Sequence, residues 1–162
     1  MVAAMPASPL AATVPATAPA HGLRFRAMTG ADLDAVMAIE VEAYPFPWTR
    51  GNFLDSLACG YRLWVAETGT DSAPSLVGYG VVTVHLDEAE LMNITVTVAS
   101  QGQGWGRALL DQLMADARER HVRRMFLEVR PSNLPGRALY ARAGFIQIGL
   151  RKGYYPAEGG RE

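Results

Sequence analysis

Two side chains suited to proton transfer stand in the last third of the chain, Glu128 and Tyr140. Glu128 lies in MFLEVR (125–130), an otherwise apolar stretch with the pattern of a strand, and a carboxylate there is seldom buried without a purpose. Such a carboxylate can act as a general base that removes a proton from an attacking nucleophile. A salt bridge with Arg130 or another basic neighbour is the structural alternative.

Tyr140 follows Asn133 by seven residues within a helix expected over 133–144, so both side chains should lie on one face, about 10 Å apart. That face can line a single groove. Each residue also has a purely structural interpretation, since asparagine suits a helix N-cap and tyrosine often packs on a core. The spacing alone therefore leaves both interpretations open.

Glycine is concentrated in QGQGWG (101–106), between the β-branched run LMNITVTV (91–98) and a strongly amphipathic helix. A glycine cluster permits unusual dihedrals and close approach of another group to the backbone. Because a helix N-terminus has unpaired N–H groups and the positive end of the dipole, this arrangement predicts a phosphate site. The spacing matches neither a Walker loop nor a Rossmann turn. A turn that only closes a strand–helix connection is the alternative.

Composition limits the class of protein. The chain has 162 residues, 49% of them hydrophobic, and a net charge of −1, as expected for one globular domain with no nucleic-acid-binding surface. No apolar run reaches the roughly 18–20 residues of a membrane span. The single cysteine, Cys59, suits a reducing cytoplasm and is expected as a buried thiol, and the three scattered histidines show no metal-ligand spacing. Residues 1–22, rich in alanine and proline, are expected to form a flexible tail.

The remaining elements alternate between strands and helices. Strands are expected over 23–28, 61–67, 75–85, 91–98, 125–130 and 145–150, and helices over 29–43, from Thr49, from Trp105 and over 133–144. Residues 61–85 read as a hairpin. This order predicts an α+β or mixed α/β fold.

Five motifs in this order carry a family resemblance: NITV, QGQGWG on the pattern Q/R-x-x-G-x-G/A, LEVRPSN, ALYARAGF and GYYP. Over about residues 23–160 the chain resembles the GCN5-related N-acetyltransferase (GNAT) family, and its FPW is similar to that of the RimI-type ribosomal-protein-alanine acetyltransferases. The resemblance implies a mostly antiparallel, twisted sheet flanked by helices and splayed between its fourth and fifth strands, in a domain spanning 23–162. Relatives continue into a final strand beyond GYYPAEGGRE, which here is missing or supplied otherwise.

The resemblance also implies acetyl-CoA as cosubstrate, without a metal, and assigns the site residues. The pyrophosphate would bind the backbone N–H groups of Gly102, Gln103, Gly104, Trp105, Gly106 and Arg107. The pantetheine arm would bind Asn133 and the backbone of Ile94, Thr95 and Val96. Glu128 would be the general base, and Tyr140 the acid that protonates the departing thiolate. Many relatives have a basic residue at Gly102 and Asp-Pro at Thr97-Val98, so phosphate affinity here would rest more on backbone groups and Arg107.

The implied acceptor is a protein N-terminal α-amine, that of the N-terminal alanine of ribosomal protein bS18, with no membrane and no direct nucleic-acid partner. The loop AYPFPWT (43–49) is stiffened by two prolines. With KGYYPAEGG, it would form a groove walled by Phe46, Trp48, Tyr154 and Tyr155; a hydrophobic clamp on the core is the alternative. Two other functions stay open, namely acetylation of a small-molecule amine and a non-catalytic CoA-binding module.

Overall fold

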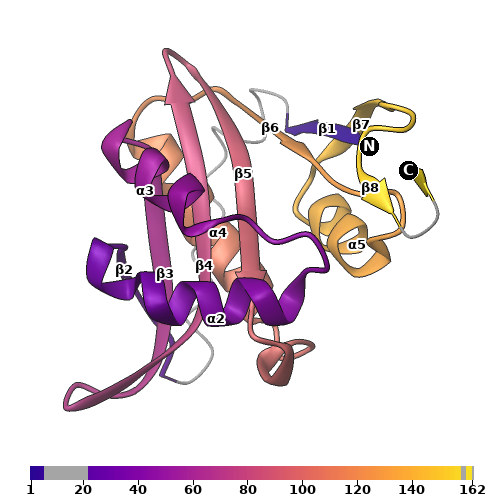
Figure 1. Cartoon of the computed structure of the whole chain (residues 1–162). Coiled ribbons are helices and arrows are strands. Elements are labelled where there is room, and N and C mark those ends of the chain that lie inside the picture. Colours follow the sequence, from indigo (N-terminus) through magenta and orange to yellow (C-terminus); the bar gives the residue numbers. More distant parts are fainter. Residues whose placement is uncertain (6–21, 158–159, 162) are drawn as a thin grey trace.

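The computed structural model describes residues 1–5, 22–157 and 160–161, which form a twisted seven-stranded sheet in the order β2-β3-β4-β5-β6-β1-β7 (Figure 1). All neighbours in it are antiparallel except β5 and β6, which are parallel. This arrangement confirms the predicted mixed α/β fold with a mostly antiparallel sheet. The strands are β1 (Val2–Met5), β2 (Arg24–Ala27), β3 (Arg62–Thr70), β4 (Ala73–His85), β5 (Glu88–Val96), β6 (Arg124–Glu128) and β7 (Ile146–Gly149), with a separate pair β8 (Pro156–Ala157) and β9 (Gly160–Arg161).

Helices cover both faces of the sheet. The 3-10 turn η1 (Gly30–Asp32) leads into α2 (Leu33–Ala43), which with α3 (Arg50–Ala58) packs on one face around Phe53 and Tyr79. On the other face, α4 (Trp105–Glu119) and α5 (Leu134–Arg142) bury a second cluster, which includes Leu109 and Leu113. The expected start at Thr49 is confirmed, because its Oγ1 accepts a hydrogen bond from the Asn52 backbone N–H at 3.3 Å.

Strands β5 and β6 separate part of the way along their length. Residues Glu88–Leu91 of β5 pair with Arg124–Leu127 of β6, but β5 then continues to Val96 while paired only with β4. The last five residues of β5 therefore have one open edge. This confirms the predicted splay, since β5 and β6 are the fourth and fifth strands when counted from β2.

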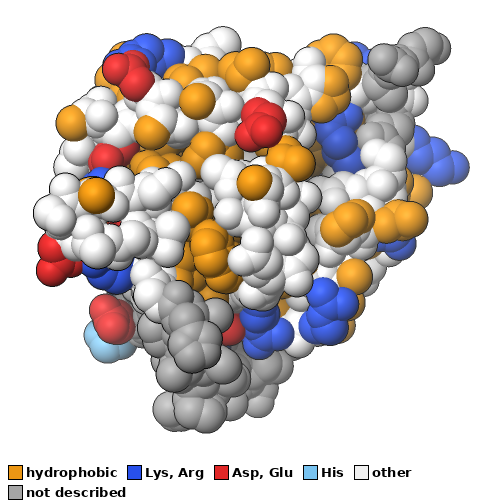
Figure 2. Space-filling view, turned by 90° about the horizontal axis from the view of Figure 1, so that it is seen from below, with side chains coloured by type: hydrophobic (Ala, Val, Ile, Leu, Met, Phe, Trp, Pro, Cys, Tyr) orange, Lys and Arg blue, Asp and Glu red, His pale blue; other side chains and the backbone are white. Residues whose placement is uncertain are grey.

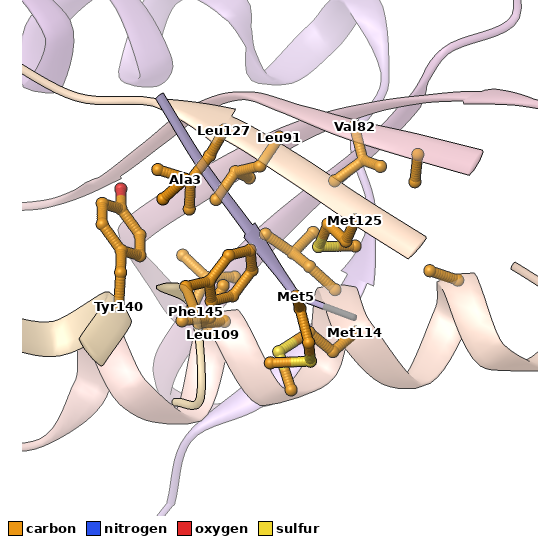
Figure 3. Packing of buried hydrophobic residues seen from close by; sticks show 14 of the residues in the cluster. Ala3, Met5, Val82, Leu91, Leu109, Met114, Met125, Leu127, Tyr140 and Phe145 are labelled. Carbon is orange, nitrogen blue, oxygen red and sulfur yellow. The ribbon is translucent and has the colours of Figure 1, made fainter. Parts of the chain in front are cut away.

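The N-terminal segment is part of the sheet, so the expectation of a flexible tail is wrong for residues 2–5. β1 pairs with both β6 and β7, and Ala3 and Met5 are each 1% exposed. Figure 3 shows these two side chains among Leu127, Phe145 and other members of the cluster. A short apolar strand is stable here because neighbouring strands satisfy its backbone on both sides. Residues 6–21 of the predicted tail lie outside the described residues.

Three further observations concern the classes of function considered above. Cys59, expected to be buried, is exposed as the C-cap residue of α3, because the chain turns outward at the end of that helix. Within the described ranges, every helix is too short or too polar to cross a membrane. In the same part of the chain, no three His, Cys, Asp or Glu side chains come together as a metal site.

Candidate active site

A cavity of about 920 Å³ occupies the space where β5 and β6 separate. One wall is the open edge of β5 and the opposite wall is α5 with the loop before it. The turn after β5 and the segment that follows α2 complete the lining. The lining residues are 43–46, 94–96, 101, 102, 104, 106, 107, 130, 132, 133, 135, 136, 138–140, 142 and 156. Seen from below, hydrophobic side chains are visible in hollows near the middle of the surface, and basic side chains lie at several places around its edge (Figure 2).

The glycine-rich turn of residues 101–106, where the anion cradle is predicted, leaves backbone donors at the start of α4 unpaired among the residues that the structure describes. Gly102 and Gly104 have φ of 76° and 85°, which favour glycine, and Gly104 is the N-cap of α4. Within the described residues, the backbone N–H groups of 102–106 donate to no acceptor. The N–H of Arg107, by contrast, donates to the Gly104 carbonyl at 3.1 Å, so it is already used within the turn. The free donors thus end one residue earlier than predicted.

Gly106 keeps the cavity open beside the cradle. A Cβ atom there would lie 3.8 Å from the Leu139 side chain and 3.9 Å from the Val96 side chain, in ordinary contact with both walls. A larger side chain would extend into the gap between β5 and α5. The guanidinium of Arg107 is engaged, because its Nε contacts Asp111 at 2.9 Å and its NH1 donates to the Arg142 carbonyl at 3.0 Å.

Backbone groups at the end of β5 face the opening between β5 and β6. The carbonyl of Ile94 accepts from the Tyr44 hydroxyl at 3.2 Å, and that of Val96 accepts from Gln101 Nε2 at 3.3 Å. Because backbone groups alternate in direction along a strand, the N–H groups of these two residues point to the open edge, and that of Thr95 points toward β4. Ile94 and Val96 can therefore offer donors to a bound molecule.

Asn133 and Tyr140 both line the cavity from α5, as their spacing predicted. Asn133 is also the N-cap, since its Oδ1 accepts from the Gly136 N–H at 2.9 Å. The cap requires glycine at 136, because a Cβ there would come within 2.8 Å of the Asn133 side chain. Tyr140 is 8% exposed, and burial raises its pKa well above the ordinary range of tyrosine. Its ring packs beside Phe145 while the hydroxyl points away from α5 (Figure 3).

Glu128 lies close to this cavity without being one of its lining residues. Its side chain is 19% exposed, and Oε1 is 3.0 Å from NH1 of Arg151, so a salt bridge forms with Arg151 and not with Arg130. The pKa of Tyr155 is raised to about 12, first by burial and then by the charge of Glu128. Tyr155 in turn raises the pKa of Tyr140 after the larger effect of burial. Glu128, Tyr155 and Tyr140 thus share one electrostatic environment.

Three of the four aromatic residues expected to wall the groove lie around two arginines. The Arg130 guanidinium is 5.7 Å from the ring centroid of Phe46 and 4.6 Å from that of Tyr155. The Arg151 guanidinium is 5.1 Å from the ring of Tyr154. Trp48 does not join them.

Trp48 packs on Phe53, with ring centroids 5.3 Å apart, in the cluster beneath α2 and α3. For this residue the hydrophobic clamp is correct, and the prediction of a groove wall is wrong. The reason is the backbone of the loop, which directs Phe46 toward the cavity and Trp48 toward the core.

Several residues at the site were not identified from the sequence. Tyr44 lines the cavity and donates a hydrogen bond to β5. Arg130 makes cation–π contacts with two aromatic rings, and Arg151 forms an ion pair with Glu128. Tyr44 lies beside the FPW motif and Gln101 begins the glycine motif, so the position of these two residues next to recognised motifs could have predicted that they lie at the site. Arg151 had none, because its contact with Glu128 depends on how two distant segments fold together.

Comparison with known proteins agrees with this geometry. The sequence model of the Acetyltransferase (GNAT) family matches residues 33–145. The [ribosomal protein bS18]-alanine N-acetyltransferase of Escherichia coli K12 is 38% identical over 132 residues, which cover 81% of this chain and 86% of that protein. The enzyme of the same name from Haemophilus ducreyi is 36% identical, covering 81% and 88%.

A solved structure gives the same result for the fold. The crystal structure of the ribosomal-protein-alanine N-acetyltransferase of Escherichia coli superposes with a TM-score of 0.78 at 34% identity, covering 86% of this chain and 87% of that one. The predicted resemblance to ribosomal-protein-alanine acetyltransferases is thereby confirmed. With its splayed sheet, its glycine cradle and these relatives, the chain belongs to the GNAT family of acetyltransferases.

Proposed function

We propose that this protein transfers an acetyl group from acetyl-CoA to the N-terminal α-amine of a protein, namely the N-terminal alanine of ribosomal protein bS18. The names of the relatives support this acceptor. The observation that carries the chemistry is the cavity itself, which joins a phosphate cradle, an open strand edge and the Tyr140 hydroxyl. A ribosomal protein as acceptor supports a cytoplasmic location for the reaction.

The residues present fit acetyl-CoA. The N–H groups of 102–106 suit the pyrophosphate, because they converge at the positive end of α4 and have no other acceptor in the described part of the chain. The open edge at Ile94 and Val96 suits the amides of the pantetheine arm. Asn133 uses Oδ1 for its cap, which leaves the Nδ2 group for the cavity.

The cradle makes Gly106 a direct test of coenzyme binding. We expect Gly106→Val to raise the Kd for acetyl-CoA about tenfold or more, because overpacking of a filled site costs on the order of 1–3 kcal/mol. Calorimetric titration measures the affinity, and thermal unfolding checks the fold. Gly30→Val, at a site with open space around the added Cβ, is the matched control. An unchanged Kd in folded Gly106→Val would contradict the assigned path of the coenzyme.

Direct transfer then needs two proton movements. The amine nitrogen attacks the thioester carbonyl carbon, whose oxygen would be stabilised by an N–H of β5, and the C–S bond breaks. Glu128 takes the proton lost by the amine, directly or through a water molecule. Tyr140 gives its proton to the departing sulfur; a tyrosine hydroxyl carries its proton at neutral pH, and burial raises the pKa of Tyr140 further.

The contact between Glu128 and Arg151 is compatible with this role. The Arg151 side chain is 58% exposed, and exposed ion pairs contribute little to stability. A substrate amine can therefore displace Arg151 from the Glu128 carboxylate. The Arg151 guanidinium lies over the Tyr154 ring and reaches the Glu128 carboxylate, so a cation of the substrate that approaches from this side can reach the same carboxylate. A protonated α-amine entering between the rings of Tyr154, Tyr155 and Phe46 would occupy the same position.

The acceptor is tested with a panel of amines. We expect efficient turnover of a peptide with N-terminal alanine and the bS18 sequence, and at least about tenfold lower kcat/KM for free lysine, polyamines and aminoglycosides, because only an extended peptide can follow the groove. Blocking the peptide N-terminus should abolish turnover, and mass spectrometry should locate the acetyl group on the α-amine.

Other outcomes separate the alternatives. A small amine that outperforms every peptide would replace the acceptor but keep acetyl transfer. Binding of acetyl-CoA with no turnover of any amine would favour a non-catalytic CoA-binding module.

A further inference from the structure

The carboxyl group of Glu40 is buried without a cation beside it. Glu40 lies in the last turn of α2 and is 1% exposed. None of the described basic residues forms an ion pair with it. Burial of an unpaired carboxylate is costly unless donors replace the lost water. Glu40 also takes no part in the chemistry proposed above, so its retention needs another reason.

The donors around this carboxylate come from three elements. Oε1 accepts from the backbone N–H of Trp48 at 2.7 Å, and Oε2 accepts from the hydroxyl of Tyr79 on β4. The amide of Asn93 on β5 lies 3.5 Å from both oxygens. Glu40 therefore connects the segment after α2 to β4 and to β5, and β5 lines the cavity.

The segment that Glu40 holds is Tyr44–Trp48, here called the acceptor turn. Its second and fourth residues are prolines, so only Tyr44, Phe46 and Trp48 have backbone N–H groups. The N–H of Tyr44 donates to the backbone carbonyl of Glu40 at 3.1 Å, and that of Trp48 donates to its carboxylate. The Glu40 side chain thus fastens the Trp48 end of the turn, while the Tyr44 end is held by the backbone bond that closes α2.

The residues between these two ends reach the cavity. Tyr44, Pro45 and Phe46 line it, and the Tyr44 hydroxyl is hydrogen bonded both to the Ile94 carbonyl and to Thr95 Oγ1, at 3.2 and 3.0 Å. A shift of the turn would therefore move Phe46 relative to β5 and the Arg130 guanidinium beside it.

We propose that Glu40 is a positioning residue for the acceptor: by fastening the Trp48 end of the acceptor turn to β4 and β5, its side chain sets the position of the wall that an incoming peptide contacts. This inference rests on the proposed function. It requires Glu40 to act on binding of the peptide and not on binding of acetyl-CoA, whose cradle lies on another segment. It also makes Glu40 more than a stabilising group.

The test compares Glu40→Leu, which has similar size but no acceptor, with Glu40→Gln, which retains an oxygen for the Trp48 N–H. We expect Glu40→Leu to raise KM for the alanine peptide at least about tenfold, with the Kd for acetyl-CoA within twofold of wild type. Glu40→Gln should restore most of the peptide KM. Asp116→Ala, which removes another buried carboxylate with a hydrogen-bonded partner, Arg62, is the control for lost stability alone.

Each result decides the matter. Folded Glu40→Leu with an unchanged peptide KM, or with a Kd for acetyl-CoA raised as much as the KM, overturns the inference, as does an equal rise of KM in Asp116→Ala. If Glu40→Leu does not fold, Glu40→Asp replaces it, because its carboxylate is withdrawn by about 1.5 Å from Trp48 and the same rise in KM is expected. Failure of the proposed function is recognised separately, since wild type would then not acetylate the peptide; the series is then measured with the preferred acceptor.

Discussion

Replacing Glu128 with glutamine is expected to lower kcat by roughly 10²–10⁴-fold, the range typical of a lost general base. Glutamine has nearly the same shape but cannot accept the proton of the attacking amine. The Kd for acetyl-CoA should stay near that of wild type, because Glu128 does not line the cavity assigned to the coenzyme. Steady-state kinetics with the alanine peptide gives kcat, and calorimetry gives the affinity.

Glu90→Gln is the matched control, since Glu90 is an exposed carboxylate on the neighbouring strand β5 and should leave kcat unchanged. Tyr140→Phe should also lower kcat, because it removes the proton given to the thiolate while the ring keeps its packing on Phe145. Turnover like that of wild type in both Glu128→Gln and Tyr140→Phe would mean that the Glu128–Arg151 salt bridge is structural and that the assigned acid and base are wrong.

The second large effect concerns stability. Met5→Ala is expected to lower the free energy of unfolding by about 2–5 kcal/mol, because Met5 is 1% exposed and truncation of a buried methionine leaves a cavity. In a domain of this size the change corresponds to a fall in Tm of roughly 5–20 °C. Denaturant or thermal unfolding followed by circular dichroism measures it.

Met92→Ala makes the same chemical change at a residue that is 39% exposed, and it should cost less than about 1 kcal/mol. Equal, small effects of the two substitutions would show that β1 does not occupy its place between β6 and β7 in solution. A large effect of Met5→Ala alone would establish the N-terminal strand as part of the domain.

Local patterns were sufficient for most elements of the fold. The helical period of the apolar residues in 105–119, together with the glycines before them, predicts α4. The capping pattern at Thr49 predicts the start of α3. The position of β1 could not be obtained in this way. Val-Ala-Ala-Met has weak strand propensity, and its stability comes from two strands more than a hundred residues away.

The site shows the same division. The cradle and the Asn133–Tyr140 face follow from spacing along a single segment, and the structure brings both to one cavity. The pairing of Glu128 with Arg151 and the fastening of the acceptor turn by Glu40 join segments that are distant in sequence. For Trp48 and Phe46, two residues apart in one motif, only the path of the backbone decides which faces the core.

The place of β1 also has a consequence for biosynthesis. Val2 is translated long before its partners Glu128 and Gly149. The nascent chain must therefore carry an unpaired apolar segment until β6 and β7 have been made and can pair with it. Such long-range pairing slows folding and exposes strand edges meanwhile. We expect the yield of native protein to depend on translation speed and chaperone supply more strongly than the size of the domain would suggest.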